Sequence, residues 1–435
     1  MSAARAWWLT AVVLSLVAAP AADAATLRLD AKFGEGGIAR VRFGSGQTGT
    51  DIRPLRPVRQ PDGRVLLAAA SYVDHGNSQI LLARFTRSGR PDSTFGHGGR
   101  KRLGLGWNFE PQAVYVQPDG RILVLGADGY GPFMYPSPGQ FGLVRLLPNG
   151  SRDRTFGTNG FVAWNPPWRD ETFSLFALPA VFVPQGDGGV FAAGVVEEAI
   201  EVGDPPQWPY PRVRRVVFVR FKENGAVDES FGLAGVIEQL EGPDFFFYAW
   251  AALPDGRIVV LAQHSEGWAA STSWLIRFSP EGTLDRGFGQ DGSVRFDLDP
   301  QRVRELVPAR DGSLVFVYAK RLRRILPSGQ LDARFGTACG RPPLSAGKLG
   351  RSAAVTSEGG GALTTGTRFR GGAPPVSFVI RYGSDGCVAG RPLRVRAVSV
   401  GPPLLLGRHV ALVGATDESK YPALATALAL ARIRR

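Results

Sequence analysis

Seven arginines recur at comparable places along the chain, each inside an apolar run and a few residues before a glycine-containing turn. They are Arg84, Arg145, Arg220, Arg277, Arg324, Arg381 and Arg432. The Phe of a Phe-Gly pair follows eleven residues after five of them, at Phe95, Phe156, Phe231, Phe288 and Phe335. Equal spacing of this kind indicates a copied structural unit, so repetition constrains the fold more than any other feature.

The second copy shows the content of one unit most clearly. Four short apolar or alternating segments read as strands, at 112–117, 121–126, 141–147 and 161–164. Asp119-Gly120 and Asn149-Gly150 supply the turn chemistry between them. An Asp-Gly pair or a close relative marks the same first turn in six units, so each unit is expected to form a small antiparallel sheet.

Seven units of about 60 residues, all built from short strands, favour a β-propeller over an open solenoid. The chain ends on a third-strand sequence at 428–433, while 30–34 and 38–43 supply the missing turn and fourth strand. We therefore predict an all-β, seven-bladed β-propeller of four-stranded blades. An N-terminal strand that completes the C-terminal blade would close the ring and remove both sheet edges.

Residues 1–24 carry one basic residue, an apolar stretch, a proline and a small-x-small ending, as secretory signal peptides do. A membrane anchor is the alternative, but the apolar stretch is shorter than the roughly 18 to 20 residues that span a bilayer. We expect a cleaved signal peptide, no membrane span, and a periplasmic or secreted protein. The remainder, 25–435, is expected to be a single propeller domain whose seventh blade is shared by residues 27–43 and about 395–435.

The segments Gln117 to Val124 and Arg145 to Gly160 resemble the delta-60 repeat, a secreted bacterial β-propeller repeat written roughly QPDGKILVAG and LARLNADGSLDTTFGTGG. The resemblance recurs over nearly the whole mature chain. It departs from the pattern at Cys387 to Pro392, where Asp-x-x-Phe-Gly is lost, and in a short fifth unit. The resemblance implies a fold and an extracytoplasmic setting, and it implies no shared activity.

An Asp stands three residues before a Phe in six units, at Asp30, Asp92, Asp153, Asp228, Asp285 and Asp332. We interpret these residues as structural, because the carboxylate can accept backbone N–H bonds in a turn and the Phe provides a buried anchor. A ring of calcium loops would need more clustered oxygen ligands. Each repeated Arg either pairs with the Asp eight residues later or lines the central channel, where a ring of arginines would hold an anion.

Cys339 and Cys387 lie in neighbouring units. In an oxidising compartment an even pair of cysteines indicates a disulfide, and two separate buried thiols are the alternative.

The net charge is +13, and 51 residues are Lys or Arg. This balance favours anionic partners such as an acidic glycan or an envelope protein. The arginines are spread through every unit without forming a run, which argues against nucleic acid.

Loops of variable length are expected on one face of the disc, and variable loops on a rigid scaffold commonly carry binding. Their aromatic and polar residues are the candidate ligand contacts: Trp107, Tyr130, Trp168, Trp208, Tyr210, His264, Trp268, Arg321 and Arg368. Such rings would suit a sugar or peptide, although each ring can also simply cover a blade edge.

The sequence offers little for catalysis. The four histidines show no metal-binding spacing, and no G-x-S-x-G motif occurs. We expect a monomeric binding module for a glycan, peptide or envelope component, without metal or cofactor. A lyase or hydrolase of acidic polysaccharide, with a site assembled from distant loops, is the alternative function.

Overall fold

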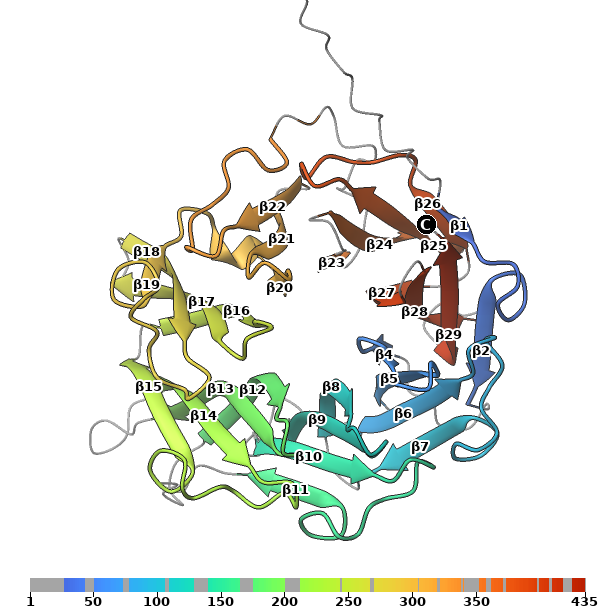
Figure 1. Cartoon of the computed structure of the whole chain (residues 1–435), viewed down its shortest axis with the longest axis horizontal. Helices are drawn as coiled ribbons and strands as arrows, with labels where there is room; N and C mark the ends of the chain where they lie inside the picture. The colour runs from blue at the N-terminus through green and yellow to red at the C-terminus, as the bar shows by residue number, and fades with distance from the viewer. Residues whose placement is uncertain are drawn as a thin grey trace, which may run out of the picture.

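The computed structural model describes residues 27–43, 51–72, 78–105, 109–128, 140–164, 175–199, 212–242, 245–266, 270–303, 305–318, 321–337, 339, 352–356, 361–370, 373–396, 399–406, 409–417 and 425–434. Small antiparallel sheets stand around a central axis as blades of a ring (Figure 1). This arrangement confirms the predicted all-β propeller. No helix in these ranges is long and apolar enough to cross a membrane.

Four sheets contain four strands each, in chain order from one edge of the sheet to the other. The first comprises β8 (Phe109–Val116), β9 (Ile122–Asp128), β10 (Gln140–Leu146) and β11 (Phe161–Trp164). The second comprises β12 (Leu175–Pro184), β13 (Val190–Ala199), β14 (Arg212–Phe221) and β15 (Val236–Gly242). The third comprises β16 (Phe245–Ala252), β17 (Ile258–Glu266), β18 (Ala270–Phe278) and β19 (Ser293–Arg295). The fourth comprises β23 (Ser352–Thr356), β24 (Ala362–Arg370), β25 (Ala373–Tyr382) and β26 (Leu393–Arg396).

Two sheets contain five strands, because one edge position is divided into two short strands. One comprises β3 (Asp51–Pro54) and β4 (Val58–Arg59), which both pair with β5 (Val65–Tyr72), followed by β6 (Ser78–Phe85) and β7 (Arg100–Gly104). The other comprises β27 (Ser399–Leu406), β28 (His409–Asp417) and β29 (Ala425–Arg434), and both β1 (Arg28–Leu29) and β2 (Ile38–Arg42) pair with β29.

The predicted count of seven four-stranded blades is wrong. Six sheets have four strands or more, whereas β20 (Val307–Pro308), β21 (Leu314–Tyr318) and β22 (Arg321–Ile325) form a three-stranded sheet within the described ranges. A short 3₁₀ helix, η2 (Pro300–Arg302), precedes this sheet. In a complete unit the fourth strand starts just after the Phe-Gly turn, as β7 does. In this unit Cys339 stands just after the turn and is bonded to Cys387 near the next sheet, so a cross-link occupies the place of a regular strand start.

Closure of the ring by the N-terminal segment is confirmed. Strand β2 lies antiparallel to β29, with Ile38 opposite Ala431 and Arg42 opposite Ala427. The Arg432 Nε donates to the Asp30 carboxylate over 2.7 Å, although the two residues are 402 positions apart. The segment from β1 to β2 therefore completes the last sheet, whose other strands come from the opposite end of the chain (Figure 1).

Neighbouring sheets bury apolar residues on both of their faces. On β6, Leu81 and Ala83 pack in one cluster with Phe33, while Ile80 and Leu82 pack in another with Phe109. A middle strand therefore needs apolar side chains on both faces, which explains the near-continuous apolar runs in the sequence.

The repeated Arg residues pair with the repeated Asp residues, which is the first of the two alternatives stated for them. In six units the Nε of Arg lies 2.6–3.0 Å from the Asp Oδ2, through Arg84, Arg145, Arg220, Arg277, Arg324 and Arg432. Each guanidinium also lies over the Phe of its unit, with its carbon 4.2–4.9 Å from the ring centroid. Arg381 belongs to the unit that lost this Asp, and Ala389 takes the corresponding place, with its N–H bonded to the Arg381 carbonyl.

The same arginines also join one sheet to the next. The Arg84 Nη1 donates to the Pro148 carbonyl over 2.5 Å, and the Arg277 Nη1 donates to the Pro327 carbonyl over 2.9 Å. The Arg432 Nη1 donates to the Arg87 carbonyl over 2.8 Å, across the point where the ring closes. One side chain thus ties its own turn and the turn of the following sheet, which explains why the motif recurs around the ring.

Acid should weaken this ring. Burial raises the pKa of the Asp153 carboxyl, but hydrogen bonds from Thr155 and the charge of Arg145 outweigh burial and hold the pKa below its ordinary value of 3.8. The pKa of Asp92 is lowered in the same way by Thr94 and Arg84. A carboxyl with a lower pKa in the folded than in the unfolded chain stabilises the fold above the unfolded pKa of about 3.9, and this stabilisation is lost as pH falls through the folded value.

We therefore expect the urea midpoint to stay nearly constant from pH 7 to about pH 5 and to fall below about pH 4. Urea titrations followed by tryptophan fluorescence at several pH values would measure this dependence. A midpoint that rises as the pH falls below 4 would contradict it.

Candidate functional site

Most of the ligand contacts expected on the variable loops lie outside the described residues. Trp107, Tyr130, Trp168, Trp208, Tyr210 and Trp268 fall there, as does the side chain of Arg368. Within the described part, His264 lies on β17 with its ring 4.9 Å from that of Phe245. Arg321 lies on β22, with its Nη1 3.5 Å from the Gly336 and Thr337 carbonyls. His264 and Arg321 belong to different sheets, so they do not form one site.

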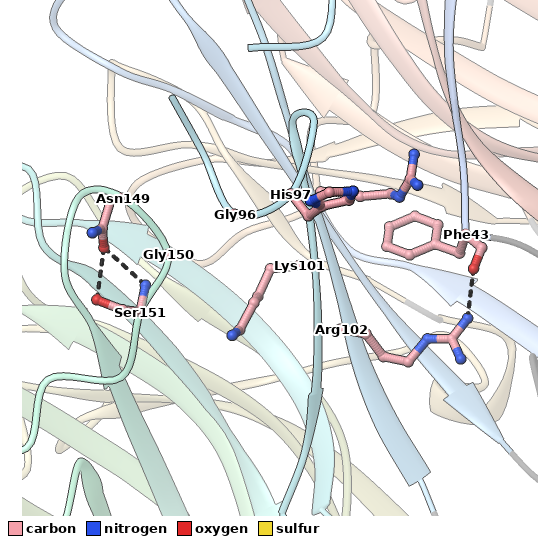
Figure 2. A pocket seen from close by; sticks show the side chains of 9 residues that line it. Phe43, Gly96, His97, Lys101, Arg102, Asn149, Gly150 and Ser151 are labelled. Atoms are coloured by element: carbon pink, nitrogen blue, oxygen red, sulfur yellow. Dashed lines mark hydrogen bonds between the residues drawn. The ribbon is translucent and has the colours of Figure 1, made fainter. Parts of the chain in front are cut away.

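A pocket of about 440 Å³ lies at the outer edge of the ring, between strand β7 and the turn at 149–151 that follows β10. Phe43, at the end of β2, adds a third wall, so three successive sheets contribute to the pocket (Figure 2). The lining residues are Phe43, Gly96, His97, Arg100, Lys101, Arg102, Asn149, Gly150 and Ser151. Its volume lies within the range of small-molecule sites, about 300–1,000 Å³.

The repeated motif holds the walls of this pocket together. The Gly96 N–H donates to the Asn149 carbonyl over 2.8 Å. The Arg84 guanidinium holds the neighbouring Pro148 carbonyl. Gly150 adopts φ 86°, and a Cβ there would approach the Phe95 ring to 2.8 Å, so only glycine lets this turn seat on that ring. The turn of one sheet is thereby fixed against the strand of the preceding sheet.

The pocket is rich in cations. Arg100, Lys101 and Arg102 follow one another along β7, and all three are half-buried. The Arg102 Nη2 donates to the Phe43 carbonyl over 2.8 Å, which fixes the position of that arginine. Lys101 extends between the 149–151 turn and the Phe43 wall (Figure 2). No carboxylate stands among the lining residues, so nothing in the lining neutralises these charges.

The turn opposite Lys101 is oriented by its own hydrogen bonds. The Asn149 Oδ1 accepts from the Ser151 N–H over 2.9 Å and from the Ser151 hydroxyl over 2.7 Å (Figure 2). The amide oxygen is thus occupied, so the Asn149 NH₂ remains as a donor and the Ser151 oxygen keeps lone pairs that can accept. The turn offers one donor and one acceptor beside the cations.

A second pocket repeats this geometry one sheet further along the ring. It has a volume of about 540 Å³ and is lined by Thr155, Gly157, Thr158, Phe161, Val162, Ala163, Asn224, Gly225 and Ala226. Here Val162 occupies the place of Lys101 in the strand, and its Cγ2 would lie 2.7 Å from a Cβ on Gly225. The second pocket is therefore an uncharged copy of the first.

Other units also place an apolar residue where Lys101 stands. The position two residues before the middle of this comparison is irrelevant to its result, because the spacing from the Phe of the Phe-Gly pair is the same in each unit. The corresponding residues are Ala39, Val162, Ile237 and Val294. A residue shared by the copies serves the repeat itself, whereas a charge in one copy serves something particular to that copy.

Sequence reasoning missed this pocket. It searched the variable loops for ligand contacts, whereas the pocket lies beside turns of constant length. The Arg-Lys-Arg run at 100–102 was the available signal, because it replaces a segment that reads Phe-Val-Ala at 161–163 and Val-Ile-Glu at 236–238. The partnership of β7 with residues 43 and 149–151 was not visible in the sequence.

The arrangement suits binding of an anion more than bond cleavage. Three cationic side chains and an amide converge on one space, and no lining residue is a carboxylate, cysteine or tyrosine. A general acid–base pair needs two titratable groups held within reach of the reacting bond. Of the lining residues, His97 alone titrates near neutral pH, so the pocket holds charge without such a pair.

Two segments of the chain match a known family, the domain of unknown function (DUF5122) beta-propeller, at residues 60–95 and 117–156. Each segment begins at the Gln before an Asp-Gly turn and ends on the Phe of a Phe-Gly pair. The matched stretch therefore corresponds to one copy of the repeated unit. No curated protein matches the chain.

Solved structures with a similar fold have little sequence in common with the chain. One is a protein of unknown function from Dyadobacter fermentans, 9% identical, with 94% of this chain and 99% of that chain covered and a TM-score of 0.42. The polysaccharide lyase Uly1 is 13% identical over 92% of this chain and 93% of its own, with a TM-score of 0.45. The α-L-arabinofuranosidase Arb93A from Fusarium graminearum is 9% identical over 91% and 97%, with a TM-score of 0.42. The matched repeat units and the ring of sheets together identify the chain as a β-propeller repeat protein.

Proposed function

We propose that this protein is an extracytoplasmic binding module that holds an anionic ligand in the cationic pocket between β7 and the 149–151 turn. The observation that carries the proposal is Lys101, a charge at a position that is apolar in the other units compared above. Its immediate neighbours are also cationic, and the pocket walls are fixed by the repeated motif. A rigid, donor-rich pocket binds an anion with little reorganisation.

The setting follows from the N-terminal sequence and the cross-link. Residues 1–24 have the pattern of a secretory signal, and we propose that it is cleaved on export. The Cys339–Cys387 disulfide fits an oxidising compartment, the periplasm or the exterior. We assign the repeat to the delta-60 type on the segments that resemble it. An acidic glycan or an envelope component is the proposed class of partner, and the aromatic residues of the variable loops remain predicted contacts for a larger ligand.

Replacing Lys101 with Val, the residue of the uncharged pocket, should weaken binding of dextran sulfate by about 10-fold or more. A hydrogen bond to a charged group contributes about 1.5–3 kcal/mol, and 1.4 kcal/mol is tenfold in affinity. Calorimetric titration with dextran sulfate and with neutral dextran would measure the change. Neutral dextran should not bind wild type in this pocket.

Two control variants separate the pocket from net charge. Lys222→Val removes one charge from an exposed side chain outside the pocket, and it should change the affinity for dextran sulfate less than twofold. Val162→Lys places a cation in the second pocket and should raise the number of sites per chain. Equal losses in Lys101→Val and Lys222→Val would refute the proposal, and turnover of an acidic polysaccharide would favour the alternative enzyme.

A further inference from the structure

The chemistry of the cationic pocket also indicates the class of anion. Resting on the function proposed above, we infer that the pocket binds a uronic acid residue of an acidic glycan. The sugar carboxylate lies at Lys101 and Arg100, its hydroxyl groups meet Asn149 and Ser151, and an apolar face of the ring lies against Phe43. The inference rests on pocket size, on the mixture of donors and acceptors, and on the apolar wall.

The pocket is too large for a simple inorganic anion. Its volume is about 440 Å³, whereas a water molecule in the liquid occupies about 30 Å³. A bare sulfate or phosphate would fill a small part of this space and leave the rest to solvent. An organic anion of sugar size would contact the lysine and both walls together.

The turn at 149–151 favours a ligand with hydroxyl groups. Ser151 donates its hydroxyl proton to Asn149, so the Ser151 oxygen can only accept from a ligand. Sulfate, phosphate dianion and carboxylate groups have no proton to donate. A sugar hydroxyl can donate to Ser151 and accept from the Asn149 NH₂, which satisfies both groups of the turn.

The walls around Lys101 include apolar surface. Phe43 lies on the side of Lys101 away from the Asn149 turn (Figure 2). Gly96 and Gly150 present no side chain, which leaves room beside the lysine. The C–H face of a pyranose ring packs against an aromatic ring, whereas an inorganic anion gains nothing from that contact.

An acidic peptide is the other macromolecular class with carboxylates. An extended peptide offers its donors and acceptors along a line, with a rise of about 3.3 Å per residue, and it commonly adds to a strand edge. Here one turn gathers the donor and the acceptor at residues 149 and 151, across the lysine from the aromatic wall. A compact ring bearing several hydroxyl groups matches this arrangement better than an extended chain does.

The test compares three probes on the full mature protein: tetragalacturonate, dextran sulfate and a tetraglutamate peptide. The variants are Ser151→Ala, which removes the acceptor, and Phe43→Leu, which removes the aromatic wall and keeps an apolar side chain. We expect each variant to weaken tetragalacturonate binding by about 3- to 10-fold, as loss of one hydrogen bond or ring contact does. Their affinity for dextran sulfate should stay within about twofold of wild type, and circular dichroism melts should be unchanged.

The outcomes separate this inference from the proposed function. If both variants bind tetragalacturonate as wild type does, or lose both polyanions equally, the uronate inference is overturned while Lys101-dependent anion binding still stands. Tighter Lys101-dependent binding of tetraglutamate than of tetragalacturonate would overturn it in favour of a peptide. If wild type binds none of the three probes through Lys101, the proposed function fails as well.

Discussion

Asp153→Ala is expected to destabilise the fold by about 3–5 kcal/mol, a large part of the total stability of a typical protein. Asp153 and Arg145 are each only 4% exposed, and their Nε–Oδ2 distance is 2.8 Å. The substitution leaves the Arg145 charge buried without its carboxylate, and it also removes the acceptor for the Thr155 N–H and hydroxyl. Urea unfolding monitored by tryptophan fluorescence would measure the loss.

An exposed Asp in the same sheet provides the matched control. Asp119 also pairs with an arginine, Arg121, but its side chain is 44% exposed. Asp119→Ala should therefore cost about 1 kcal/mol or less. The double variant Arg145→Met, Asp153→Leu removes both charges and should recover part of the stability lost in Asp153→Ala. Equal losses in the Asp153 and Asp119 variants would show that burial of the pair is unimportant.

Removing residues 1–43 is expected to have the second large effect, a loss of cooperative unfolding together with aggregation. The deletion takes away β1 and β2 and leaves the edge of β29 without its partners. It also removes the carboxylate of Asp30 from Arg432 and the buried ring of Phe33 from its cluster. Loss of a buried Phe side chain alone costs about 3–5 kcal/mol. Size-exclusion chromatography and thermal melts would detect both changes.

A circular permutant tests whether contact or connectivity matters in that segment. Residues 28–43 are moved to follow Arg434 through an Arg-Ser-Gly turn copied from 87–89, and the chain then starts at residue 51. This order restores the eight-residue spacing from Arg432 to Asp30 that the other units have, as between Arg84 and Asp92. The permutant should melt cooperatively as a monomer. If the deletion variant melts as wild type does, or the permutant fails to fold, ring closure is not the role of the segment.

Features that depend on short stretches of sequence were predictable. The Arg–Asp pairs form at a fixed separation of eight residues, and the turn glycines adopt positive φ as an Asp-Gly turn requires, with Gly120 at 85°. The disulfide partners were predictable from the cysteine count, and the closing strand from an incomplete last unit. Each of these inferences used spacing or turn chemistry within one copied unit.

The regularity of the repeat also misled the prediction. A count of seven arginines was taken as seven equal blades, but β20–β22 forms a three-stranded sheet in the described ranges. Arg324 keeps its Asp332 partner in that sheet, with Nη2–Oδ2 at 2.6 Å, so the motif is present where the complete blade is not. An arginine and its turn report the middle of a unit and carry no information about its outer strand.

The sequence by itself determined the unit, its strands and turns, the internal Arg–Asp pairs and the joining of the two ends, because these follow from local spacing and hydrophobic period. Only the tertiary structure decided which residues of different units meet. The pocket draws on Phe43, Lys101 and Asn149, about 50 positions apart along the chain, and these three residues meet because neighbouring sheets pack face to face. Packing between units fixes that contact, and no spacing within a unit encodes it.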